Sequence, residues 1–148
     1  CAFQNAQDIT KIIRRSEYES RGFAKKLVPF FKKNDAEKTC ELVWKFLREY
    51  IDYGAEPKEK QTGKTIARFF LDKKGDCKHY ATTAVGILNA CNIPAWFVVV
   101  RQSDDRTKFH AYCQAFVNNK IVTVDPCRKN FNSECRFSKK YSIHPIKK

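Results

Sequence analysis

The sequence predicts an α+β fold in which helices come first and an antiparallel sheet follows. Apolar residues recur with the helical period over the first 91 residues, whereas the segment over 95–124 is rich in Val, Phe, Tyr and Trp. Within this second segment, Asn118-Asn119 separates two strand-like runs, as the turn of a β-hairpin does. The change of period therefore assigns the helices to the first part of the chain and the sheet to the second.

Two helical segments are predicted before residue 54. Residues 1–33 are helical and basic, and Pro29 is expected to kink or end that segment. A helix over about 36–53 has a suitable cap in Asn34-Asp35 and a stop signal in Gly54. One apolar stripe along this helix is expected to face the core: Cys40, Val43, Trp44, Leu47, Tyr50 and Ile51.

The remaining elements follow from turn signals and from the change of period. The prediction is a loop over 54–64, a short helix or turn over 65–72, a helix from near Cys77 to about Cys91, and strands over 96–100, 109–117 and 120–124. The last twenty or so residues are predicted to add one short strand and a basic tail.

Length and composition limit the classes of function. The 148 residues, 43 % of them hydrophobic, fit one domain with a real core. No run approaches 18 apolar residues, so no transmembrane helix is predicted. The net charge of +13 indicates which binding partners the protein would attract, but it does not indicate its fold. Because the basic residues are scattered and no known nucleic-acid motif accompanies them, we expect loose affinity for anions or nucleic acid rather than specific recognition.

The seven cysteines are an odd number, so at least one thiol is free unless two chains are bridged. They contain no C-x-x-C pair, which argues against a structural zinc site, and we expect neither a metal nor a cofactor. Their pattern favours a reducing compartment. Cys1 as an N-terminal nucleophile is a further alternative, although its neighbours offer no base.

Cys77 is the candidate nucleophile. It follows Gly75-Asp76 and opens a predicted helix, whose N-terminus stabilises a thiolate. Lys74 and Lys78 add positive charge nearby. The alternative is a half-buried cysteine that merely begins the helix, and position alone does not decide between the two.

His110 is the candidate base among the three histidines. His79 follows Cys77 by two residues, so on a helix it points about 200° away and is expected to be a partly exposed side chain. His144 lies in the basic tail and is expected to be structural or solvated.

The predicted hairpin supplies a partner for this base. With a two-residue turn at Asn118-Asn119, Val117 faces Lys120 and Tyr112 faces Asp125. His110 and Asp125 then share one face as diagonal neighbours, close enough for a carboxylate to reach an imidazole. The alternative for Asp125 is a turn residue before a proline.

Four short motifs resemble those of the transglutaminase-like superfamily. Gly75–Ala81 resembles the G-D-C-x-x-x-A/S motif of the nucleophile. Leu88–Trp96 is similar to the L-x-x-x-G-I-P-A segment that leaves the nucleophile helix, with Asn92 in place of the usual Gly. Phe109–Tyr112 resembles the H-x-W/Y strand, and Val124–Pro126 resembles the L/V-D-P segment. Within this superfamily, the chain most resembles the compact proteins of bacteria and their phages.

The resemblance covers about residues 61–127 and implies a papain-like fold, with a nucleophile helix packed on an antiparallel sheet. It implies that Cys77 attacks an amide or ester carbonyl, that His110 moves the proton, and that Asp125 orients the imidazole. It also implies an oxyanion site made by the Cys77 backbone N–H and a second donor. Gln61 is the candidate for that donor, with a solvated loop residue as the alternative.

The chain is interpreted as one transglutaminase-like domain over 1–148. A helical basic extension covers 1–35, the catalytic core 36–127 and a basic C-terminal segment 128–148. A bacterial cytoplasm or a phage particle would suit such a protein, and the oligomeric state stays open.

The predicted function is hydrolysis of an amide or peptide bond by a cysteine protease or amidase acting on a polypeptide or other amide. The chain has no acidic D-x-D-x-D-G loop, which disfavours a calcium-dependent cross-linking enzyme. Three alternatives remain. One is a catalytically silent binding or structural module in a larger assembly, and another is a cross-linking or deamidating transglutaminase. The third is a basic protein associated with nucleic acid, in which the cysteine and histidine are incidental.

Overall fold

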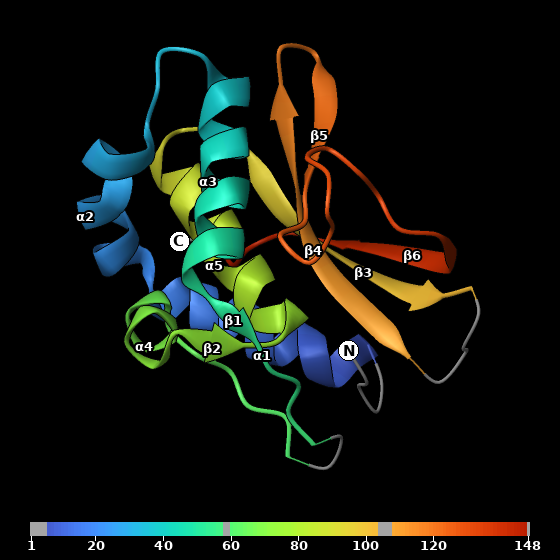
Figure 1. Cartoon of the computed structure of the whole chain (residues 1–148). Helices are drawn as coiled ribbons and strands as arrows, with labels where there is room; N and C mark the ends of the chain where they lie inside the picture. Colours follow the sequence, from blue (N-terminus) through green and yellow to red (C-terminus); the bar gives the residue numbers. More distant parts are fainter. Residues whose placement is uncertain (1–5, 58–59, 104–107, 148) are drawn as a thin grey trace.

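The computed structural model describes residues 6–57, 60–103 and 108–147 (Figure 1). Its helices are α1 (Ala6–Glu19), α2 (Arg21–Phe31), α3 (Ala36–Tyr50), α4 (Ile66–Asp72) and α5 (Cys77–Ala90). Its strands are β1 (Asp52–Tyr53), β2 (Lys74–Gly75), β3 (Ala95–Gln102), β4 (Phe109–Val117), β5 (Lys120–Val124) and β6 (Phe137–Ile143). None of the described helices is long and apolar enough to cross a membrane. This order of helices first and an antiparallel sheet second confirms the predicted α+β fold.

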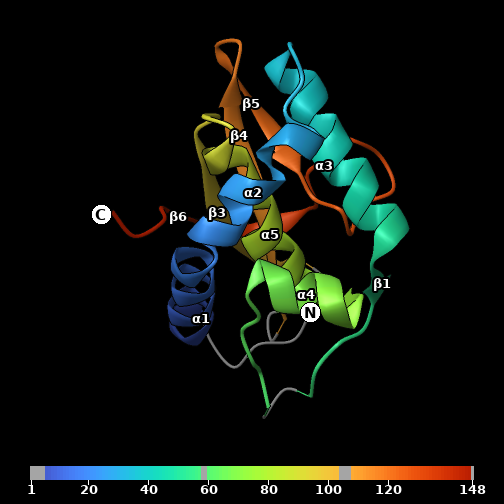
Figure 2. The same cartoon turned by 90° about the vertical axis from the view of Figure 1, so that its left-hand side faces the viewer.

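Helix α5 occupies the centre of the molecule. It is buried at every position from Cys77 to Leu88, and after its first turn its residues are mainly apolar or small on all sides, as in a helix enclosed by the core. Helices α1, α2, α3 and α4 pack around it, while β3 and β4 cover its remaining side (Figure 2). The buried hydroxyls of Thr82 and Thr83 donate to the carbonyls four residues earlier, so they cost little inside the core.

The main sheet has four antiparallel strands in the order β5-β4-β3-β6. Asn118 and Asn119 both have positive φ, 52° and 63°, as a two-residue hairpin turn requires. Val117 pairs with Lys120, and Cys113 pairs with Val124. The predicted hairpin and its register are therefore confirmed, and Asp125 follows β5 where the register brings it opposite Tyr112.

Alternate residues of β4 face opposite sides of the sheet. Tyr112 forms a small buried cluster with Val98 and Val100, separate from the main core. His110 lies two residues before Tyr112 and shares its face. The other face of β4 joins the main core through Phe109, Ala111, Cys113, Ala115 and Val117.

Helix α3 ends at Tyr50, so the prediction that it continues to about residue 53 is wrong. Ile51 is extended, with φ −108° and ψ 136°. The Asp52 N–H donates to the Lys73 carbonyl and the Gly54 N–H to the Gly75 carbonyl. These bonds pair β1 with β2 in parallel and bring Tyr53 beside Gly75.

Local signals at other element ends are confirmed. Asp35 caps α3 by accepting a hydrogen bond from the Glu37 N–H at 3.2 Å. Asn92 has a φ of 63°, the left-handed conformation for which glycine is the usual choice and asparagine a tolerated one. Pro29 lies inside α2, which ends two residues later at Phe31.

Gly75 is predicted to be required for packing at the start of α5. A Cβ atom there would lie 2.5 Å from a Phe69 ring carbon and 2.8 Å from His79 Nδ1, and both rings are buried. We expect Gly75→Ala to lower the free energy of unfolding by about 1–3 kcal/mol through overpacking. Urea denaturation of this variant and of wild type measures the loss.

Gly22→Ala is the matched control, because nothing lies within 4 Å of its added Cβ in α2. It should leave stability unchanged or raise it by up to about 1 kcal/mol. Equal unfolding midpoints for the two alanine variants would contradict the packing argument.

Candidate active site

His110 and Asp125 form a buried pair at the centre of the candidate site. His110 Nε2 lies 2.7 Å from Asp125 Oδ2. The other oxygen, Oδ1, accepts a hydrogen bond from the Cys127 N–H at 3.0 Å. Since a carboxylate only accepts, Nε2 carries the hydrogen, and Nδ1 is the nitrogen that can take a proton from a nucleophile.

Tyr112 packs against one face of the His110 imidazole. Its ring stacks on His110 with centroids 5.5 Å apart and an angle of 30° between the planes. The Tyr112 hydroxyl donates to Glu134 at 2.5 Å, which fixes the phenol in turn. The His110 ring is therefore held at its edge by Asp125 and at its face by Tyr112.

Helix α3 fixes the backbone that follows Asp125. Arg48 Nη1 donates to the carbonyls of Pro126 and Arg128, at 2.8 and 2.7 Å. The Trp44 indole N–H also donates to the Arg128 carbonyl, at 3.3 Å. These bonds span about eighty residues of sequence, so they tie the carboxylate of the site to the first half of the chain.

Cys77 is the first residue of α5, as predicted, and it is fully buried. It is disulfide-bonded in this structure. The five other cysteines of the described ranges are free thiols: Cys40, Cys91, Cys113, Cys127 and Cys135. Cys1 lies outside the described residues. Because only a thiolate is nucleophilic, Cys77 must be reduced before it can attack a carbonyl.

Asp76, at the start of α5, and Asp125, after β5, both act electrostatically on Cys127 and Tyr53. Burial, together with the charges of Asp125 and Asp76, raises the pKa of the Cys127 thiol. The same two carboxylates and burial raise the pKa of Tyr53. Asp76 precedes Cys77, and Asp125 pairs with His110. The meeting of Cys77 with His110 stays a prediction.

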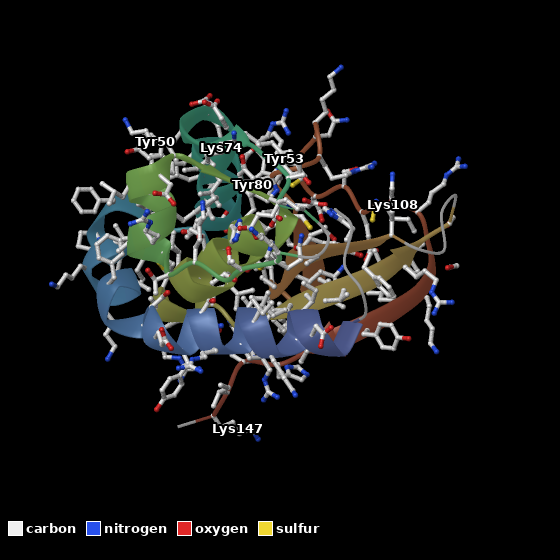
Figure 3. The ribbon with its side chains drawn as sticks, turned by 90° about the horizontal axis from the view of Figure 1, so that it is seen from below. Tyr50, Tyr53, Lys74, Tyr80, Lys108 and Lys147 are labelled. Atoms are coloured by element: carbon white, nitrogen blue, oxygen red, sulfur yellow. The ribbon has the colours of Figure 1, made fainter. Side chains whose placement is uncertain are left out.

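A cavity of about 570 Å³ opens beside His110. Tyr53 and Tyr80 line it and lie side by side, with stacked rings 6.3 Å apart (Figure 3). The Tyr80 hydroxyl donates to the Ile51 carbonyl at 3.1 Å. Sequence reasoning gave neither tyrosine a role, and it placed Tyr53 in a helix that it continued through residue 53. The rest of the lining comprises Arg48, Ile51, Asp52, Gln102, Pro126, Cys127, Arg128 and Cys135.

Lys78 is a fully buried lysine next to the candidate nucleophile. Its Nζ donates to Asp76 Oδ2 at 2.6 Å, to Glu56 Oε1 at 2.7 Å and to Gln61 Oε1 at 2.7 Å. Two carboxylates therefore offset its charge. The positive charge that the sequence suggested for the Cys77 thiolate is engaged elsewhere.

His79 is buried, so the expectation of a partly exposed side chain is wrong. Its Nδ1 accepts from the Asp76 N–H at 2.9 Å, which leaves Nε2 to donate to the Thr62 carbonyl at 2.8 Å. Burial lowers its pKa, in keeping with this neutral form. His79 thus caps the first turn of α5 and holds the preceding loop against it.

Gln61 lies beside Lys78 rather than in the cavity lining. Its amide Nε2 donates to the carbonyls of Glu56, at 3.1 Å, and Pro57, at 2.9 Å. Both amide hydrogens are thus engaged within the loop. The oxyanion role predicted for Gln61 stays a prediction, and it would require these bonds to break.

One group of side chains in the described ranges has the composition of a metal site. Ligand atoms of Glu56, Asp76 and His79 lie within 4.8 Å of one another. The carboxylates, however, already accept hydrogen bonds from Lys78, and both His79 nitrogens are engaged. The group as arranged does not fit a metal ion.

Because of this cluster, the free energy of unfolding is predicted to decrease as the pH is lowered. His79 has a pKa below its ordinary 6.5, and Glu56, despite the opposing effect of burial, has its pKa lowered to about 2 by hydrogen bonds from Lys78 and Thr62. Both groups bind more protons in the unfolded chain. Their contribution is therefore complete above pH 6.5, and falls first through His79 and then, below pH 4.5, through Glu56.

His79→Gln should flatten the dependence of the urea midpoint on pH between 7.5 and about 5, because the variant lacks the buried base. The groups facing His79 are Asp76, Lys78 and Glu56. The exposed His144, replaced in His144→Gln, is the matched control and should keep the wild-type slope. An identical slope in both variants would show that His79 is not the group responsible.

Solved structures share this fold. A predicted cysteine protease from Cytophaga hutchinsonii matches with a TM-score of 0.60 at 17 % identity, over 82 % of this chain and 42 % of its own. A predicted protease from Parabacteroides distasonis has a TM-score of 0.66 at 16 % identity, over 79 % and 26 %. Calcium-bound LapG from Legionella pneumophila has a TM-score of 0.61 at 17 % identity, over 84 % and 74 %. The chain thus spans less than half the length of the first two.

No curated protein matches the sequence. The family model of the transglutaminase-like superfamily matches residues 24–126, which is more than half of the chain. This match includes the helix that begins at Cys77, the strand that carries His110 and the segment that ends with Asp125. The predicted membership is confirmed, and the chain belongs to the transglutaminase-like superfamily.

Proposed function

We propose that this protein is a cysteine hydrolase that cleaves amide or peptide bonds with Cys77, His110 and Asp125. The buried pair of His110 and Asp125, 2.7 Å apart beside a cavity, is the observation that supports this most. The structural neighbours that are predicted proteases support a peptide substrate. Among the described residues, the cavity lining includes two arginines and a single acidic residue, which favours acidic polypeptides on a chain of charge +13.

The reaction begins after reduction of Cys77. His110 Nδ1 takes the thiol proton, and the thiolate attacks the carbonyl carbon of the substrate. The tetrahedral intermediate collapses to a thioester as the imidazolium gives its proton to the leaving amine. Water then attacks the thioester with His110 as base, which releases the acid and restores the thiol. Asp125 keeps the hydrogen on Nε2 and stabilises the imidazolium.

The oxyanion of this intermediate would meet the first turn of α5. The Cys77 backbone N–H lies at the positive end of that helix. We propose Tyr53 as the second donor in place of Gln61, because Tyr53 lines the cavity and Gln61 does not. Its raised pKa keeps the phenol protonated and able to donate.

A divalent cation is not part of this proposal. LapG was solved with calcium bound. Here the described residues with the composition of a cation site hold the ammonium of Lys78 instead. Each step above therefore uses side chains and backbone of this chain alone.

A catalytically silent binding module is the second candidate. The observation that favours it is the state of Cys77, which is buried and disulfide-bonded. A silent module would keep this cysteine unreactive after reduction, whereas a hydrolase requires an ionised thiol at neutral pH. The two candidates therefore differ in a property that can be measured without knowing the substrate.

Iodoacetamide alkylation of the native, reduced protein separates them, with each cysteine followed by peptide mass spectrometry from pH 5 to 9. Cys77 should react with an apparent pKa of roughly 3.5–7.5. Cys127 and Cys135, which line the cavity, are internal controls. Burial raises the pKa of both, to about 11 for Cys135, so they should stay unreactive.

His110→Ala should remove the reactivity of Cys77 below pH 7, because the thiolate loses its imidazolium partner. Omitting the reductant should abolish the reaction in wild type, since the sulfur is then engaged. A reduced Cys77 that titrates near 8.5 or higher would reject the hydrolase in favour of the silent module.

Tyr53→Phe is predicted to lower kcat for p-nitrophenyl acetate by about 10²–10³-fold, the usual effect of losing one oxyanion donor. Its KM and the alkylation of Cys77 should change little, because the phenol acts on the intermediate. Tyr50→Phe is the matched control, since Tyr50 is not among the residues lining the cavity. Unchanged kcat in Tyr53→Phe would assign the donor elsewhere, and Cys77→Ala gives the background rate.

A further inference from the structure

We propose that Lys78 is a built-in cation, which takes the position that a divalent ion would occupy between the 56–62 loop and the start of α5. In this role it is a positioning residue for the proposed site. Only this positioning of the nucleophile rests on the proposed function. The replacement of a metal ion by the Lys78 ammonium is a property of the folded protein and does not depend on catalysis.

The geometry around Lys78 Nζ is that of a bound cation. Oxygens of Glu56, Asp76 and Gln61 surround it at 2.6–2.7 Å. An ammonium has three N–H donors, so these acceptors match its capacity. The Lys78 side chain is 0 % exposed, and Asp76 is 2 % exposed. Water therefore does not solvate this charge, and the protein oxygens must do so.

The surrounding carboxylates require such a cation. The buried Asp76 and the half-buried Glu56 converge on one point, and two such carboxylates repel each other without a positive charge. His79 does not supply that charge, because its Nδ1 accepts from the Asp76 N–H. Lys78 is therefore the group of the described cluster that compensates them.

The same contacts leave few ligand atoms for a metal ion. Glu56, Asp76 and His79 have the composition of a site, but a calcium ion takes six to eight oxygens and magnesium about six in a strict octahedron. Lys78 already engages Glu56 Oε1 and Asp76 Oδ2, and His79 Nε2 is directed to the Thr62 carbonyl, so Asp76 Oδ1 is the buried oxygen of the described cluster without a hydrogen bond. A divalent ion could enter only by displacing the ammonium.

Lys78 also organises the loop. Within the loop, Glu56 accepts from the Thr62 backbone N–H at 2.8 Å and from its hydroxyl, and Gln61 donates to the Glu56 carbonyl at 3.1 Å. Glu56, Gln61 and Thr62 are in turn attached to α5 through Lys78 and His79. Because both follow Cys77 in the first turn, the attachment fixes the backbone that presents the sulfur.

The test measures the melting temperature of four proteins with millimolar CaCl₂ or MgCl₂ and with EDTA. These are wild type, Lys78→Ala, Lys78→Met and the double variant Lys78→Ala/Glu56→Gln. Lys78→Ala leaves both carboxylates and an empty volume, whereas Lys78→Met fills that volume. The double variant keeps the empty volume of Lys78→Ala but removes the carboxylate charge of Glu56.

Wild type should melt at the same temperature in all three solutions. Lys78→Ala should melt lower, and the divalent ion should restore part of the loss in a concentration-dependent way, because an ion that binds only the folded state stabilises it. Lys78→Met should melt lower without such a response, and the double variant should respond more weakly than Lys78→Ala.

Two results would overturn the inference. In one, calcium or magnesium raises and EDTA lowers the melting temperature of wild type, which would make the cluster a metal site. In the other, Lys78→Met equals wild type both in melting temperature and in the alkylation rate of reduced Cys77. Glu56→Gln is the milder variant if Lys78→Ala does not fold, and it should melt lower than wild type with no divalent response.

The melting temperatures need no turnover, so they are informative even if the hydrolase proposal fails. Should Cys77 of wild type prove unreactive, the response of Lys78→Ala to a divalent ion still decides the role of Lys78. Should the ion instead leave Lys78→Ala unchanged while Cys77 reacts as expected, the cation proposal alone is rejected.

Discussion

The burial of α5 on all sides is the constraint on which the rest of the structure depends. A helix in the centre of a small protein must bring its first turn into the interior, yet this turn carries Asp76, Lys78 and His79. Buried charged and polar groups are tolerated only with partners. Glu56, Gln61 and Thr62 supply partners for Lys78 and His79, and Gly75 leaves room for the His79 ring. The position of the candidate nucleophile is thus a consequence of core packing.

The other half of the candidate site depends on a β-hairpin. The turn at Asn118-Asn119 sets the register of β4 and β5, and a slip of one residue would send Asp125 to the opposite face from His110. Arg48 then fixes the backbone after Asp125 from helix α3. One part of the site is therefore determined by local turn chemistry, and the other by contacts between residues far apart in sequence.

This difference explains how far the sequence was sufficient. Periodicity and turn residues predicted α5 and the hairpin, and the order of four motifs predicted the family. The parallel pairing of β1 with β2 has no local signal, because the Asp52 N–H finds its acceptor at Lys73, far along the chain. Continuing α3 through residue 53 therefore hid Tyr53. The burial of His79 was missed for a similar reason, since its partner Thr62 lies in a loop without periodicity.

The position of each cysteine, rather than its nearness to the cavity, decides which one can act as the nucleophile. Cys127 lies in the cavity lining with His110 and is a free thiol. Its own backbone N–H, however, binds Asp125, and burial and that carboxylate raise the pKa of its thiol. A thiol beside the carboxylate that orients the base cannot readily ionise. Cys77 lies instead at the positive end of α5, where the charge of neighbouring Asp76 is offset by Lys78. The lysine thus favours the nucleophile indirectly, by neutralising the carboxylate that would otherwise oppose a thiolate.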